Sequence, residues 1–130
     1  MDSKCIFCKI VNDEIPSYKV WENENFIAIL DIFPINRGMT LIISKNHLPS
    51  YVIDLDNKTL LSVLDAMKEV TTILDKKLEE SIRTTYFIEG LDVDHLHVKL
   101  IPFYEKDKNR EIPPKADDQE LSRLAQYLRS

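Results

Sequence analysis

The chain has 130 residues, long enough for one domain with a buried core that needs no disulfide staples. Hydrophobic residues make up 44% and charged residues 30%, the balance of a soluble globular protein. The net charge of −5 and the scattered lysines and arginines argue against a groove that binds nucleic acid. No apolar run is long enough for a membrane span, and the opening lacks the apolar core of a signal peptide. We expect one domain over residues 1–130, in the cytoplasm.

The first half of the chain predicts three short strands. Tyr18–Trp21 and Asn25–Leu30 lie on either side of a polar turn, and each is rich in β-branched or aromatic residues. A loop over residues 31–37 follows, and Met39–Ser44 is an apolar run typical of a buried strand. Only two glycines occur, Gly38 and Gly90, which excludes the glycine-rich loops of P-loop and Rossmann proteins.

One long helix is predicted over Lys58–Leu78, with Asp56 as its N-cap. Apolar residues recur there at helical spacing, and we interpret the stripe as core packing. The stripe is broad enough that one of its edges could also contact a partner subunit. The stripe comprises Leu60, Val63, Leu64, Met67, Val70, Leu74 and Leu78.

The second half predicts a strand at Thr84–Ile88 and another over Asp92–Pro102, where the pattern alternates. Leu96, Val98 and Leu100 point to one face, and His95, His97 and Lys99 to the other.

Asp117 or Asp118 can cap a last helix after a charged loop. This helix is expected to pack through Leu121, Leu124, Ala125 and Leu128. The fold class is therefore α+β, an antiparallel sheet with one long helix and a C-terminal helix.

Two cysteines and two histidines form a candidate metal site. Cys5 and Cys8 have the C-x-x-C spacing that lets two thiolates hold one metal from a tight turn. His47 and His95 would complete a Cys2His2 tetrahedron, the ligand set that zinc prefers. With four protein ligands, such a zinc is structural. A free or redox-active cysteine pair is the alternative, although no β-α-β pattern surrounds it.

The alternating histidines suggest a nucleophile. A neutral imidazole can attack phosphorus when its other nitrogen is held by a hydrogen bond. Taken alone, His95 and His97 favour the simpler interpretation of a solvated or metal-binding pair.

Four segments, in order, resemble the histidine-triad (HIT) family. Residues 93–102 resemble its His-φ-His-φ-His motif and residues 38–47 its segment ending in Pro-Lys-x-His. Residues 26–34 resemble its nucleoside-binding segment, and residues 5–17 resemble its opening.

The resemblance implies an α+β homodimer that binds a purine mononucleotide and forms a nucleotidyl-histidine intermediate. His97 matches the nucleophile and Asp31 the aspartate that receives the ribose hydroxyls. The zinc-containing members use the positions of Cys5, Cys8, His47 and His95 as ligands. The apolar residues that enclose the base match Phe7, Ile10, Ile15, Leu30 and Ile32.

Several positions depart from the family pattern. Lys99 stands in place of the third histidine, where it can hold a phosphate oxygen but cannot shuttle protons near neutral pH. Met39 replaces a histidine that helps to orient the nucleophile, and Ser44 replaces the proline of Pro-Lys-x-His. The loop at residues 89–92 is short and acidic, where the family has donors to phosphate.

Three functions are therefore weighed. The first is a nucleotide phosphoramidase, hydrolase or nucleotidyl transferase acting through His97 and Lys99. The second is a catalytically weakened, zinc-stabilised nucleotide-binding or regulatory module. The third, a zinc-finger-like nucleic-acid binder, is disfavoured by the acidic charge.

Overall fold

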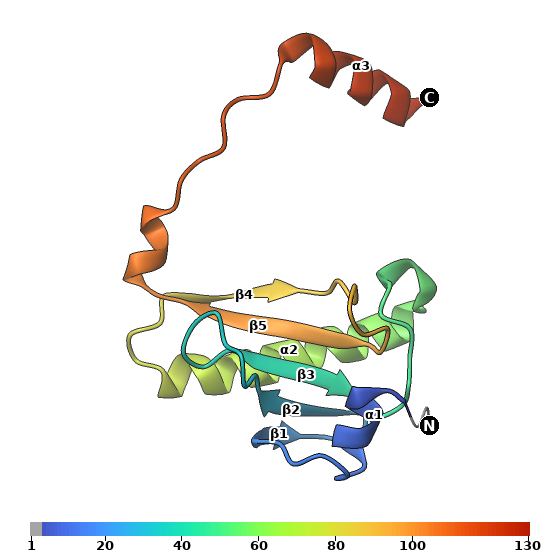
Figure 1. The fold of residues 1–130 in the computed structure, drawn as a ribbon, viewed down its shortest axis with the longest axis vertical. Helices are drawn as coiled ribbons and strands as arrows, with labels where there is room; N and C mark the ends of the chain where they lie inside the picture. Colours follow the sequence, from blue (N-terminus) through green and yellow to red (C-terminus); the bar gives the residue numbers. More distant parts are fainter. Residues whose placement is uncertain (1–3) are drawn as a thin grey trace.

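The computed structural model describes residues 4–130, which form an antiparallel sheet with helices (Figure 1). The strand order is β1-β2-β3-β5-β4, and every neighbouring pair is antiparallel. The strands are β1 (Lys19–Glu22), β2 (Phe26–Leu30), β3 (Thr40–Ser44), β4 (Arg83–Phe87) and β5 (His97–Phe103). The helices are α1 (Ile6–Val11), α2 (Asn57–Lys77) and α3 (Asp118–Arg129), with 3-10 turns at Val52–Asp54 and Glu105–Asn109. The predicted α+β class is confirmed.

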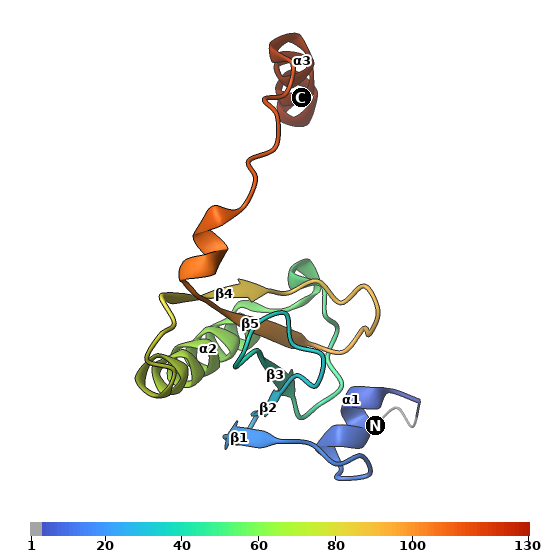
Figure 2. The ribbon, with the colours of Figure 1, turned by 60° about the vertical axis from the view of Figure 1, so that its left-hand side comes forward.

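Helix α2 covers one face of the sheet, and α1 lies on the other (Figure 2). The Asp56 carboxylate caps α2 by accepting the N–H of Thr59 at 2.8 Å, as predicted. Buried residues alternate along β2 and β3, so Ala28 and Ile42 join the α2 layer while Ile27 and Ile43 join the α1 layer. Because both faces are covered, these strands read as continuous apolar runs in the sequence.

The buried face of α2 is narrower than the apolar stripe in its sequence. Val63, Ala66, Val70 and Leu74 are buried against the sheet. Leu64 remains half exposed, because it lies at the edge of the face that meets the strands.

Strand β5 begins later than predicted, so His95 lies in a bend before it. Strand β3 ends at Ser44, opposite the start of β5, and the chain then turns away. Beyond that point one backbone bond to β3 remains, in which the Leu96 carbonyl accepts the Ser44 N–H at 3.1 Å. The segment after β3 also holds this bend: the Asp94 carboxylate accepts from the backbone N–H and hydroxyl of Ser50 at 3.0 and 2.7 Å.

The C-terminal helix forms, with Asp117 as its N-cap, but it does not pack on the sheet as expected. Leu121, Leu124 and Leu128 are exposed, and α3 stands apart from the sheet at the end of an extended segment (Figures 1 and 2). The amphipathic helix was predicted correctly, but none of its residues is buried on the described chain.

Among residues 4–130, no helix is long and apolar enough to cross a bilayer.

Two substitutions on α2 test its buried face. Leu74→Ala should lower the free energy of unfolding by about 2–4 kcal/mol, because Leu74 is 6% exposed and truncation leaves a cavity. Leu64→Ala, the same change at a residue 50% exposed, should cost less than about 1 kcal/mol. Urea unfolding of both variants measures the difference, and equal losses would contradict this orientation of the helix.

Candidate active site and metal centre

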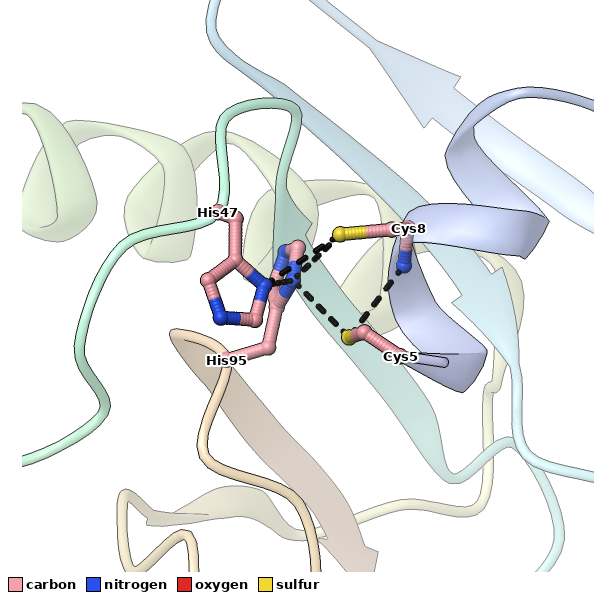
Figure 3. Close-up of side chains that lie close together, drawn as sticks. All are labelled: Cys5, Cys8, His47 and His95. Carbon is pink, nitrogen blue, oxygen red and sulfur yellow. Dashed lines mark hydrogen bonds between the residues drawn. The ribbon is translucent and has the colours of Figure 1, made fainter. Parts of the chain in front are cut away.

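The first turn of α1 brings the two cysteines to the metal cluster. No sequence signal predicted this short helix, because its cap is a thiol: the Cys8 N–H donates to the Cys5 Sγ at 3.4 Å. With the helix started at Cys5, both sulfur atoms lie on the side facing His47 and His95 (Figure 3). His47 comes from the segment after β3, and His95 from the bend before β5.

The four side chains fit a tetrahedral metal ion. Their ligand atoms all lie within 4.8 Å of one another. The Cys5 and Cys8 sulfurs are 3.4 and 3.5 Å from the His95 Nδ1, and the Cys8 sulfur is 3.2 Å from the His47 Nδ1. Zinc bond lengths of about 2.3 Å to sulfur and 2.0–2.1 Å to nitrogen imply ligand separations of roughly 3.3–3.8 Å in a tetrahedron. The cluster could therefore hold a metal ion.

The backbone selects the tautomer of His95 that can bind a metal. Its Nε2 is 2.7 Å from the Ser44 carbonyl oxygen and donates to it, which leaves the lone pair on Nδ1. Burial lowers the pKa of His95, so the ring is held neutral. The lone pair faces the two sulfur atoms and His47.

His97 is held by the residue that belongs to the metal cluster. Its Nδ1 lies 2.7 Å from the backbone carbonyl oxygen of His95, and the bond places the proton on Nδ1 and the lone pair on Nε2. Desolvation lowers the pKa of His97, and the ring of Phe7 meets it edge-on at a centroid distance of 4.6 Å. A neutral, oriented imidazole is the state that nucleophilic attack requires.

Met39 does not orient His97. It is buried, and its sulfur accepts from the Ile35 N–H at 3.4 Å. The His95 carbonyl is the group that bonds the His97 Nδ1.

A cavity of about 520 Å³ opens beside His97. Every residue predicted to bind substrate lines it, as do His97 and Lys99. The predicted residues are Phe7, Ile10, Ile15, Leu30, Asp31 and Ile32. The structure adds Ile6, Phe33, Asp92 and Val93, among others, which no motif singled out one by one. Its lining is mainly apolar with a few charged groups, as in sites for small organic ligands.

The Asp31 carboxylate is positioned by its own turn. Its Oδ1 accepts the N–H of Phe33 at 2.8 Å, which holds the side chain at the cavity wall where β2 ends.

Lys99 is already paired within the cavity. Its Nζ lies 3.1 Å from an oxygen of Glu89, and both side chains are about one-third exposed. The ammonium sits on the cavity wall with His97, but it meets a carboxylate there.

Comparison with known proteins identifies the family. The HIT-domain model matches residues 12–106, so the chain belongs to the HIT-domain family. An uncharacterised HIT-like protein of Borreliella burgdorferi is 39% identical over 110 residues, with 79% of this chain and 78% of the relative covered. The adenosine 5′-monophosphoramidase HNT1 of Saccharomyces cerevisiae is 34% identical over 102 residues, covering 78% of this chain and 64% of that one.

A solved structure also shares the fold. A zinc-bound histidine triad family protein from Mycobacterium smegmatis aligns with a TM-score of 0.73 and 26% identity, over 93% of this chain and 89% of that one.

Proposed function

We propose that this protein hydrolyses a purine nucleoside 5′-phosphoramidate, or a related nucleotide derivative, through a nucleotidyl-His97 intermediate. The observation that carries the proposal is the neutral His97, fixed by the His95 carbonyl and facing an apolar cavity that also contains Asp31. The name of the Saccharomyces cerevisiae relative supports the substrate class. Transfer of the nucleotidyl group to an acceptor other than water uses the same first step.

Different parts of the cavity wall contact the base, the ribose and the phosphoryl group of the substrate. Phe7, Ile10, Ile15, Leu30 and Ile32 enclose the base, because stacking between apolar side chains suits a purine. Asp31 accepts hydrogen bonds from the ribose hydroxyls. The phosphoryl group then lies beside His97 and Lys99.

The reaction proceeds by two displacements at phosphorus. The His97 Nε2 lone pair forms a bond to phosphorus while the P–N bond to the amine breaks, and the amine takes a proton from water as it leaves. His97 keeps its Nδ1 proton on the His95 carbonyl throughout. Water then attacks phosphorus and loses a proton to solvent, the bond to Nε2 breaks, and the nucleoside monophosphate is released.

The alternative is a nucleotide-binding or regulatory module with little chemistry. It is favoured by the Lys99–Glu89 pair, because an ammonium held by a carboxylate stabilises phosphoryl charge less well than a free donor.

Turnover of adenosine 5′-phosphoramidate separates these two functions. The wild type should release ammonia and adenosine monophosphate, and His97→Ala should lower kcat/KM by at least about a thousandfold, because the covalent route is lost. Calorimetric binding of adenosine monophosphate to both proteins is the control for an intact cavity. Equal, near-zero rates with retained binding would reject the hydrolase and leave the binding module.

We further propose that the metal is zinc and that it is structural. Two thiolates and two imidazoles are its preferred ligands, and four protein ligands leave no position for a reacting water. Cysteines that form no disulfide are typical of the reducing cytoplasm, which is the location we propose.

Metal analysis and melting test the zinc proposal. The wild type should contain about one zinc per chain, and a chelator should lower its Tm by about 10 °C or more, because metal binding adds to the folding free energy. Cys8→Ser should contain almost none, and the chelator should leave its Tm unchanged. A wild type that melts identically with and without chelator would rule out a structural zinc.

We also propose a homodimer, and α3 is the observation that favours it. A helix of 12 residues is marginal in water without a packing surface, yet the leucines of α3 are exposed on the described chain. The extended segment 110–117, stiffened by Pro113 and Pro114, spans about 25 Å, close to the width of a five-stranded sheet. Strand β4 presents an unpaired edge on the side toward α3 (Figure 1). A second copy along that edge would give α3 a surface.

Sedimentation over a range of concentrations tests the homodimer. The wild type should sediment as a dimer, and the double variant Leu124→Glu, Leu128→Glu should weaken association at least about tenfold by placing charge in the interface. Gln126→Glu, on the opposite face of the same helix, is the matched control and should dimerise like the wild type. A wild type that is monomeric at every concentration would contradict the proposal.

A further inference from the structure

The charge of the cavity does not match a simple nucleotide. Its lining includes three carboxylates, Asp31, Glu89 and Asp92, against one ammonium, Lys99. These four side chains together give the lining a formal charge of −2. An anionic phosphoryl group would enter a negative site, and binding sites usually complement the charge of their ligand.

Glu89 is the cavity carboxylate that pairs with Lys99, and two donors hold it in place. One oxygen lies 3.1 Å from the Lys99 ammonium, and the other accepts the N–H of Leu91 at 3.1 Å. The Leu91 N–H, followed by Lys99, lowers the pKa of Glu89, so this group stays ionised near neutral pH. It is close enough to His97 for the two to interact electrostatically.

The loop that carries Glu89 is built on a fixed turn. Gly90 has a φ of +65°, and a Cβ added there would collide with the Ser50 side chain. Ser50 in turn donates to the Asp94 carboxylate, which directly precedes His95. The position of Glu89 is therefore tied to the segment that holds the histidines.

The charged residues divide between two sides of the cavity. Asp31 belongs to the end of β2 with the apolar residues that would enclose the nucleoside. Glu89 and Asp92 belong to the loop between β4 and β5, on the side of His97 and Lys99. In a substrate whose nucleoside fills the apolar side, the group beyond phosphorus meets the acidic loop.

We infer that Glu89, assisted by Asp92, selects substrates whose leaving group is cationic. The chemical class is a nucleoside 5′-phosphoramidate whose amine carries a second, protonated amino group. The ammonium of such a leaving group supplies the positive charge that the cavity lacks, and it can share Glu89 with Lys99 while Lys99 turns toward a phosphoryl oxygen. This inference rests on the proposed hydrolase function.

Two adenosine 5′-phosphoramidates of equal length test the inference. One is made from 1,4-diaminobutane and ends in an ammonium, and the other is made from pentylamine and ends in a methyl group. The wild type should show a kcat/KM about fivefold higher for the cationic substrate, as expected for a partly exposed charge pair. The ratio should fall as the salt concentration rises.

Glu89→Gln should bring the ratio close to one, because the amide keeps an acceptor for the Leu91 N–H but removes the charge. Glu69→Gln is the matched control: Glu69 is exposed on α2 and outside the cavity, so the ratio should stay at its wild-type value. A wild-type ratio near one, or a ratio unchanged in Glu89→Gln, would overturn the inference.

Binding measurements distinguish a failure of this inference from a failure of the proposed hydrolase function. Where neither substrate turns over, the hydrolase fails, and calorimetric Kd values for the same two compounds then decide the charge preference. A tighter Kd for the cationic compound that is lost in Glu89→Gln supports the selection. Equal Kd values reject it.

Discussion

The hydrogen bond from the His97 Nδ1 to the His95 carbonyl joins the two halves of the site. The side chain of His95 belongs to the Cys2His2 cluster, and its backbone fixes the ring of His97 at the cavity. A displaced His95 would release both the cluster and the imidazole. Because the Ser44 carbonyl holds the His95 Nε2 and Asp94 anchors the same bend to Ser50, this arrangement depends on the end of β3 and on the segment after it. The Cys2His2 cluster and the proposed nucleophile are therefore one structural unit.

Helix α1 also connects the Cys2His2 cluster with the cavity beside His97. Its cysteines supply the sulfur atoms, while Phe7 packs against the His97 ring and Ile10 lines the cavity. A metal ion that closes the cluster would also fix the apolar wall that we propose for the base. A single turn of helix can do both because residues three apart share one side and those between them face another.

The departures from the triad pattern have compensations that are local and electrostatic. The His95 carbonyl orients His97 where a histidine is replaced by Met39. Lys99 supplies a donor at the position of the third histidine of the motif, but its ammonium forms an ion pair with Glu89. The chain thus preserves the geometry expected of the nucleophile while changing the charge that a substrate meets, which is why we place the specificity of this protein in the loop at residue 89.

The sequence by itself determined the α+β class, the strands within a few residues, α2 with its Asp56 cap, and the side chains that meet at the cluster and the cavity. Periodicity and the family pattern carry that information, because they record which residues must share a face. Only the tertiary structure decided where β5 begins, that α1 exists, that Lys99 pairs with Glu89 and that α3 stands apart. The cap of α1 is local, but it is a thiol, which is not among the usual cap residues. The start of β5 depends on where β3 ends, Lys99 meets a carboxylate ten residues away, and α3 has no buried residue on the described chain. Local patterns do not encode such partners, since contacts between distant segments form only when the chain is folded.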